Sequence, residues 1–229
     1  MGETVQERVP VLRGLDRIGR PEGVSALVLV LHGGRANSLV PARRWNLAVV
    51  RMALLAGGLD GDRAVPVLTL RYRYRGWNDA ERTRTPDPVR DALTALEQIE
   101  RRLGPVPVIL VGHSMGGRTA VRVASYPTVR AVAALAPWLP ADESVQPLAG
   151  RGLLVAHGLR DRVTDSENSV AFAARAVGVA GPVYLKLLDD GHAMLRAASA
   201  WRRLVAEFIA ATVHGPPAGA VDADRLDRD

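Results

Sequence analysis

Residues 108–117, which read VILVGHSMGG, are where the sequence most strongly indicates chemistry. An apolar run ends in a glycine, and Ser114 then stands between Gly112 and Gly116 in a Gly-x-Ser-x-Gly pattern. In a tight turn from a strand into a helix, positions this close to the serine backbone have no room for a Cβ atom. Such a turn holds the serine hydroxyl out into a site, as nucleophilic attack requires. Ser114 is therefore the candidate nucleophile.

Backbone amides near this serine are candidates for binding a negative charge. Met115 begins the following helix, whose positive end favours an anion, so we expect its amide to bind the oxyanion formed when Ser114 attacks a carbonyl. A second glycine-rich turn, LHGGR at 31–35, follows another predicted strand. The amide of Gly34 or of Arg35 is expected to complete the oxyanion hole. A phosphate-binding loop is disfavoured, because both the P-loop lysine and the dinucleotide glycine spacing are missing.

A serine hydroxyl needs a base, and the chain has five histidines. His192, in the stretch GHAML after the last predicted strand, is the expected base, because the base must reach the serine from a separate strand end. His113 adjoins the serine and must point away around the corner. His32 and His157 each precede a glycine directly after a strand and are expected to shape those turns. His214 begins the C-terminal tail.

The carboxylate that orients such a base is expected to follow a further strand. Asp161, in the stretch HGLRDRV, occupies that position. Asp165 is nearby, but it is expected to cap the next helix. Asp189 and Asp190 are expected to close the strand that precedes the base. Asp161 is therefore the expected acid.

The elements that must position these residues are short and strongly apolar. Six runs rich in β-branched residues predict strands, and none alternates cleanly with polar residues, which favours strands covered on both faces. These runs occupy residues 26–31, 65–70, 106–111, 129–135, 152–157 and 182–188. Helical patterns lie between them, at residues 41–56, 87–103, 115–125, about 165–177 and about 197–213.

Local sequence features set the ends of two of these helices. The helix at 87–103 is expected to use Asp87 as its cap and Pro88 as its first residue, and Gly104 is expected to end it. The helix at 41–56 is expected to stop at the two glycines that follow it.

Alternating strands and helices predict an α/β fold: a three-layer αβα sandwich around a mostly parallel, doubly wound sheet. Sites in such sheets lie at the carboxyl ends of the strands, where all the candidates above fall. The segment before residue 26 is expected to add an antiparallel edge strand. We expect a single domain over residues 1–213 and a disordered tail over residues 214–229, which is rich in Gly, Pro, Ala and charge.

Composition excludes several classes of function. The chain has no cysteine, which removes disulfides, cysteine-ligated metals and a cysteine nucleophile. Its net charge is +6, but arginine is scattered, so we expect no nucleic-acid partner. The N-terminus lacks an apolar leader and the longest apolar run, at 26–31, is too short to span a bilayer. A cytoplasmic protein without membrane insertion is expected, and the oligomeric state is not indicated.

Taken together, these motifs resemble the α/β-hydrolase superfamily over nearly all of residues 24–213. Four stretches carry the resemblance: LHGG at 31–34, GHSMGG at 112–117, HGLRDRV at 157–163 and GHAML at 191–195. They appear in the family's chain order of serine, acid and histidine. The resemblance implies that Ser114, Asp161 and His192 form a catalytic triad, with no metal or organic cofactor.

Where relatives carry a cap domain, this chain has only residues 136–151, so little or no lid is expected. A lidless site suits small soluble esters or thioesters. Trp138, Leu139 and Tyr72 are candidates for the substrate pocket, although the first two fit a core position equally well. The arginine-rich stretch 71–84 either attracts an anionic group of the substrate or is a solvated loop whose arginines pair with Asp79 and Glu81.

The expected activity is that of a small lidless serine hydrolase, acting through an acyl-enzyme on a small-molecule ester or thioester. Acyl transfer to another acceptor and peptide cleavage use the same triad and remain alternatives. A catalytically inactive binding module of the same fold is a further alternative.

Overall fold

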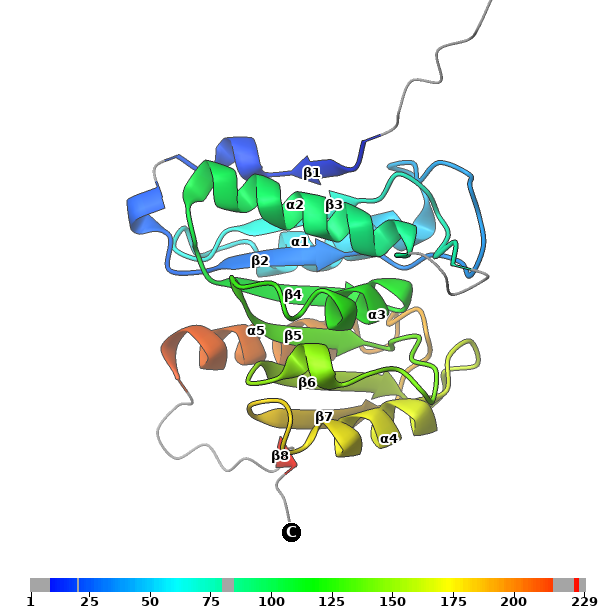
Figure 1. The fold of residues 1–229 in the computed structure, drawn as a ribbon. Helices are drawn as coiled ribbons and strands as arrows, with labels where there is room; N and C mark the ends of the chain where they lie inside the picture. Colours follow the sequence, from blue (N-terminus) through cyan, green and yellow to red (C-terminus); the bar gives the residue numbers. More distant parts are fainter. Residues whose placement is uncertain (1–8, 20, 80–84, 216–224, 227–229) are drawn as a thin grey trace, which may run out of the picture.

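A computed structural model describes residues 9–19, 21–79, 85–215 and 225–226 of the chain (Figure 1). Its strands form one sheet in the order β1-β3-β2-β4-β5-β6-β7-β8. The strands are β1 (Val11–Arg13), β2 (Leu27–Leu31), β3 (Val67–Arg71), β4 (Val108–His113), β5 (Val129–Leu135), β6 (Gly152–Gly158), β7 (Val183–Leu188) and β8 (Arg225–Leu226). The helices are α1 (Leu47–Leu59), α2 (Asp87–Leu103), α3 (Met115–Arg122), α4 (Ser166–Ala176) and α5 (Ala198–His214).

The six predicted strands are confirmed as the parallel body of the sheet, β2 to β7. The predicted N-terminal edge strand is also confirmed, since β1 pairs antiparallel with β3. Parallel pairing aligns the strand ends: Leu31 of β2 lies opposite Gly112 of β4, and Leu135 of β5 lies opposite His113. The turns after these strands are thereby brought to one edge of the sheet.

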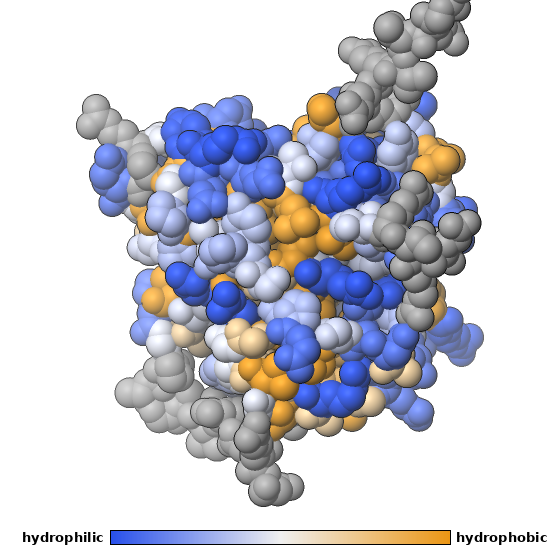
Figure 2. Space-filling model, viewed as in Figure 1, coloured by the Kyte–Doolittle hydropathy of each residue, from blue (hydrophilic) through white to orange (hydrophobic). Residues whose placement is uncertain are grey.

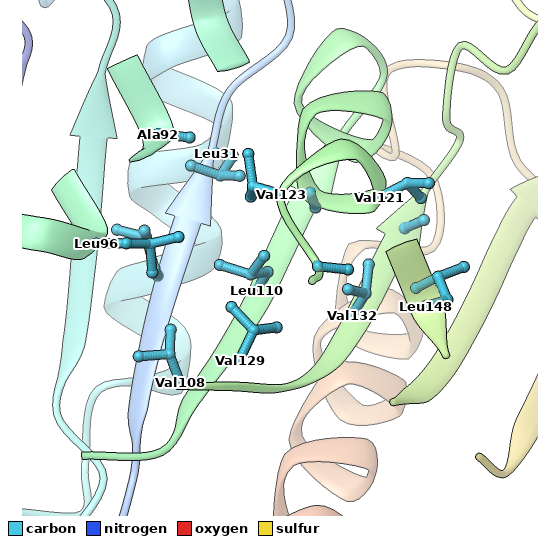
Figure 3. Packing of buried hydrophobic residues seen from close by; sticks show 14 of the residues in the cluster. Leu31, Ala92, Leu96, Val108, Leu110, Val121, Val123, Val129, Val132 and Leu148 are labelled. Carbon is cyan, nitrogen blue, oxygen red and sulfur yellow. The ribbon is translucent and has the colours of Figure 1, made fainter. Parts of the chain in front are cut away.

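Helices cover both faces of the sheet, as predicted for a three-layer fold (Figure 1). Helices α2, α3 and α4 pack on one face, and α1 and α5 pack on the other. Figure 3 shows part of the first of these layers, in which Leu96 of α2, Val121 of α3, Leu110 of β4 and Val132 of β5 belong to one apolar cluster. On the opposite face, Met52 of α1 and Trp201 of α5 belong to the second apolar cluster. Continuous apolar strands are explained by this burial on both sides.

Helix α1 differs from its prediction at both ends. It begins at Leu47 rather than at residue 41, because Pro41 is instead paired in a β-bridge with Tyr74. It also continues through the two glycines to Leu59. The side chain of Arg202 on α5 lies close to Gly58, at the place where a Cβ atom would stand.

Helix α2 has the predicted bounds, but the prediction that Asp87 caps it is wrong. The N-cap position is Pro86, and no side chain caps the helix. The Asp87 carboxylate instead accepts a hydrogen bond from Asn78 Nδ2 at 2.7 Å and contacts Arg90. The buried acid is therefore used to tie the preceding loop to the helix.

The segment between β5 and β6 contains only a short 3-10 turn, Gln146–Leu148. This confirms that the fold has little or no cap. The C-terminal tail differs from its prediction at two places: His214 is the last residue of α5, and Arg225 and Leu226 pair antiparallel with β7. The tail's other predicted residues beyond 215, at 216–224 and 227–229, lie outside the described residues.

Candidate functional site

The corner at Ser114 has the strained geometry that the sequence predicts. Ser114 has φ 55° and ψ −119°, a conformation with positive φ that non-glycine residues rarely adopt. At both flanking glycines there is no room for a larger residue. A Cβ atom at Gly112 would clash with the Gly116 carbonyl, and one at Gly116 would clash with the carbonyl of Leu31. The close approach of strands and helix thus fixes the serine at the tip of the turn.

Hydrogen bonds hold the Ser114 backbone on three sides. Its amide donates to the Leu135 carbonyl of β5 at 3.0 Å. Its carbonyl accepts from the amides of Gly117 at 3.0 Å and of Trp138 at 3.1 Å. The strained conformation is therefore held by the neighbouring strand, the following helix and the loop after β5.

The loop after β2 lies against the same corner. A Cβ atom at Gly33 would come within 3.3 Å of Ser114 Cβ, so this turn passes directly beside the serine. Of the two amides predicted to join Met115 in an oxyanion hole, that of Arg35 already donates to the Arg75 carbonyl at 2.8 Å. The Arg35 amide is thus already engaged, which favours Gly34 as the candidate donor.

His192 and Asp161 come together as the sequence predicts. His192 Nδ1 lies 2.7 Å from Asp161 Oδ2, although the residues are far apart in the chain. The His192 side chain is 16% exposed, whereas that of Asp161 is fully buried. A buried carboxylate that accepts from Nδ1 fixes the ring orientation and leaves Nε2 as the free ring nitrogen.

The environment of Asp161 keeps it ionised. Burial opposes its charge, but the amides of Thr164 and Val163 and the side chains of His192 and Thr164 all donate to it, so its pKa falls to about 2. Asp161 Oδ1 accepts both backbone hydrogen bonds, from the Val163 amide at 2.7 Å and from the Thr164 amide at 3.0 Å. The imidazole of His192 therefore faces a full negative charge at neutral pH.

Asp161 contacts a second imidazole, which the sequence analysis assigned only to a turn. His157 is fully buried, and its Nε2 lies 3.2 Å from Asp161 Oδ2. Ser169 of α4 bonds to the other ring nitrogen of His157 at 2.7 Å, and Thr164 Oγ1 donates to Asp161 Oδ2 at 2.7 Å. Burial lowers the pKa of His157, which keeps the ring neutral. Its partner Ser169 lies on the next helix, so no local sequence pattern predicts these hydrogen bonds of His157.

His113 connects the serine corner to the loop of His192. Its Nε2 donates to the His192 carbonyl at 2.8 Å. The two rings pack with their centroids 4.7 Å apart. Among the residues that the structure describes, no hydrogen bond joins Ser114 Oγ to His192 itself. The structure thus brings all three predicted residues to one edge, with His192 and Asp161 in direct contact.

The competing acids have other partners. Asp165 Oδ1 accepts from the Glu167 amide at 2.8 Å, as expected for the cap of α4. Asp189 is exposed and pairs with Arg160. Asp190 is buried and accepts from Trp201 Nε1 at 3.0 Å. The preference for Asp161 on sequence grounds therefore agrees with the observed contacts.

The three candidate pocket residues differ in exposure. Tyr72 and Leu139 are buried in the apolar cluster beneath α2, α3 and α4, whereas Trp138 is only partly buried. Trp138 takes part in a contact that the sequence does not predict: the guanidinium carbon of Arg118 lies 4.7 Å from its ring centroid and 4.3 Å from that of Trp77. Arg118 also pairs with the buried Glu143. Because these residues come from separate elements, sequence spacing does not reveal them.

The arginine-rich stretch after β3 forms ion pairs within the fold. Arg73 Nε lies 2.5 Å from the buried Asp91 of α2, and Arg73 Nη2 lies 3.5 Å from Asp87. The predicted acidic partner Glu81 lies outside the described residues. Arg73 therefore ties the loop to α2 rather than facing an anionic substrate.

Neither a metal site nor a membrane span is found in the described part of the chain. No group of three or more histidine, cysteine, aspartate or glutamate side chains there has the arrangement needed to hold a metal ion. Likewise, none of the described helices combines the length and the apolar character needed to cross a membrane.

Comparison with known structures shows the same fold. An esterase of Pyrococcus furiosus, Pf2001, matches with a TM-score of 0.63 and 18% identity, over 83% of this chain and 82% of that one. XC6422 of Xanthomonas campestris, described as a serine hydrolase without lid, matches with a TM-score of 0.63 and 16% identity, over 91% and 90%. Est1E of Butyrivibrio proteoclasticus matches with a TM-score of 0.60 and 16% identity, over 89% and 93%.

Comparison with curated protein sequences gives no match. A family model described as "Alpha/beta hydrolase family" matches residues 27–228. This match covers most of the chain and agrees with the fold and with the order of its motifs. The protein belongs to the alpha/beta hydrolase family.

Proposed function

We propose that this hydrolase cleaves carboxylic esters or thioesters through an acyl-enzyme on Ser114. The observation that carries the proposal is the hydrogen bond of 2.7 Å between His192 Nδ1 and the buried Asp161 carboxylate. This contact supports an oriented imidazole beside a permanent negative charge, at the same edge of the sheet as the strained serine. Structural relatives described as esterases or serine hydrolases agree with this chemistry.

In the proposed first step, Ser114 Oγ attacks the acyl carbon as His192 Nε2 takes the hydroxyl proton. Asp161 stabilises the imidazolium that results, without itself taking the proton. The amides of Met115 and Gly34 bind the negative oxygen of the tetrahedral intermediate. Each such donor contributes roughly 3–4 kcal/mol to transition-state stabilisation in related enzymes.

The intermediate then collapses, and the bond to the alcohol or thiol breaks as the imidazolium donates its proton to that leaving group. Water attacks the remaining acyl-enzyme with His192 again as base, and the acid product leaves with Ser114 regenerated. Every proton is thus carried by one imidazole, so no further cofactor enters the proposed cycle.

The test is hydrolysis of a matched panel of acyl chains, from acetyl to decanoyl, offered as p-nitrophenyl esters and as thioesters. We expect turnover on at least one series and its loss in Ser114→Ala. A panel with no turnover by the unmodified protein would contradict the proposal. The preferred chain length reports how long an acyl group the site accepts.

A further inference from the structure

Helix α1 has an unusual solvent-exposed face. Leu47 is 80% exposed, Leu54 is 74% exposed and Val50 is 37% exposed. The remaining exposed positions of the helix carry no polar side chain either; they are Ala53, Gly57 and Gly58. Helices that cover a sheet normally expose polar residues and bury apolar ones. Helix α1 instead buries an apolar stripe through Met52 and Ala56 and presents a second one to solvent.

Its neighbour on the same face of the sheet follows the usual pattern. Helix α5 buries Trp201 and Val205 and exposes Arg202, Arg203 and Glu207. The face that carries α2, α3 and α4 has hydrophilic areas over much of its surface, with hydrophobic areas in its middle and lower part (Figure 2). The apolar exposure of α1 is therefore not a general property of this surface.

The turn that leads into α1 adds an aromatic residue and positive charge. Trp45 is 60% exposed, and the guanidinium carbons of Arg43 and Arg44 lie 5.4 Å and 6.0 Å from its ring centroid. Both arginines are exposed. We call these residues the α1 face; it consists of Arg43, Arg44, Trp45, Leu47, Val50 and Leu54.

The segment that carries the α1 face contains no acidic residue of its own. Residues 23–59 contain four arginines and neither aspartate nor glutamate. A symmetric dimer through the α1 face would place the arginines of one copy near those of the other with no acid from this segment between them. The charge pattern therefore disfavours a second copy and favours an anionic occupant.

Arginines beside a tryptophan and exposed leucines are the combination that suits the boundary between phosphate headgroups and acyl chains. We propose that the α1 face binds peripherally to anionic phospholipid surfaces. Arg43 and Arg44 contact lipid phosphates, Trp45 lies at headgroup level, and Leu47, Val50 and Leu54 contact the upper acyl chains.

The position of the α1 face links this proposal to the candidate site. The loop from β2 into α1 contains Gly33, which lies beside Ser114, and it exposes Leu39 (68%) and Val40 (53%) before reaching Trp45. A docked α1 face thus brings the serine edge of the sheet toward the lipid surface. If the proposed function holds, the natural substrate is an acyl ester held in that surface; the docking itself does not depend on that function.

Vesicle sedimentation tests the docking, with phosphatidylcholine alone compared with an equal mixture of phosphatidylcholine and phosphatidylglycerol. We expect binding to the anionic vesicles only, and a blue shift of tryptophan emission that Trp45→Phe removes. Trp45 is a suitable reporter because it is 60% exposed, whereas Trp77 and Trp201 are buried and Trp138 is partly buried. Reversal of charge in Arg43→Glu/Arg44→Glu should weaken vesicle binding by more than about tenfold.

The matched control is Arg101→Glu/Arg130→Glu, which changes the net charge equally at two arginines outside the α1 face. This control should keep most of the binding. If both double variants weakened vesicle binding equally, overall charge alone would explain the loss, and the proposal would be overturned. Absence of binding to anionic vesicles would do the same, as would a dimer that Leu47→Asp converts to monomer.

Two further measurements separate this proposal from the proposed function. Ser114→Ala should bind anionic vesicles as tightly as the unmodified protein, because the α1 face is unchanged. Arg43→Glu/Arg44→Glu should hydrolyse a soluble p-nitrophenyl ester at the unmodified rate but lose activity on esters presented in anionic vesicles. Equal vesicle activity in that variant would contradict the link between docking and substrate.

Discussion

Four of the five histidines end or follow strands at the same edge of the sheet, but they differ in burial and in hydrogen-bond partners. His32, His113 and His157 are buried, and burial lowers the pKa of each. His192 retains exposed surface and bonds to the buried Asp161. An imidazole at a strand end is thus a candidate base only where one nitrogen faces a carboxylate and the other stays accessible. The buried three instead hold the loops in place.

Removal of the exposed imidazole should have the largest effect. We expect His192→Ala to lower kcat on a p-nitrophenyl ester by about 10⁶-fold, as in other serine hydrolases of this mechanism. Its thermal unfolding should change little, because the side chain is partly exposed. A kcat within tenfold of the unmodified value would remove the distinction between His192 and the buried histidines.

The next effect concerns the carboxylate that sets His192 apart. Asp161→Asn should lower kcat by roughly 10⁴-fold, because the amide no longer holds the required tautomer or stabilises the imidazolium. The matched control is Asp165→Asn at the cap of α4, where asparagine caps almost as well, so both activity and stability should be retained. The reverse outcome, with activity lost only in the Asp165 variant, would show that Asp161 is not the orienting acid.

The buried histidines should appear instead in the pH dependence of stability. Burial lowers the pKa of His32 to about 4 and that of His113 to about 3, so the folded protein stays unprotonated where the unfolded chain takes up protons. Stability is therefore greatest above pH ~6.5 and falls as the pH drops toward those values, by about 1.4 kcal/mol per pH unit for each histidine. Urea unfolding between pH 7 and pH 5 measures this slope.

The low pKa of Asp161 acts in the same direction but in a different range. A carboxylate whose pKa is held at about 2 contributes stability above pH ~3.8 that is lost only as the pH falls through about 2. Between pH 7 and pH 5 the slope therefore reports the histidines. A flat stability profile over that range would contradict their assignment as buried neutral rings.

The smallest effect distinguishes the two imidazoles that share Asp161. In His157→Leu the carboxylate loses one donor, so it holds a protonated His192 more strongly. The acid limb of the pH–rate profile should then move to higher pH, with a loss of only about tenfold at its maximum. His157→Gln keeps a donor at that position and should restore the profile. A rate loss with an unshifted profile would make His157 a packing residue only.

The sequence predicts the sheet well because strands buried on both faces leave continuous apolar runs, as in β5, whose bounds agree fully with the prediction. Errors occur where a tertiary contact decides the outcome. Helix α1 continues through Gly58, where Arg202 of α5 lies close by, and Asp87 accepts a hydrogen bond from Asn78 instead of capping α2. Neither partner is close in sequence.

The candidate site shows the same division. The serine corner follows from local glycine spacing, and Asp161 and His192 follow from the order of strands that places their loops at one edge. The contacts of His157 with Ser169 and of Arg118 with two tryptophans depend on side-chain orientation across separate elements. The engagement of the Arg35 amide depends on a bridge to Gly76, which the sequence does not indicate.

Covalent labelling tests the central claim most directly. A fluorophosphonate probe followed by peptide mass spectrometry should modify the unmodified protein at one residue, Ser114, and should leave Ser114→Ala unlabelled. Modification at a different serine, or an unreactive native protein that remains folded, would contradict an activated nucleophile at this corner.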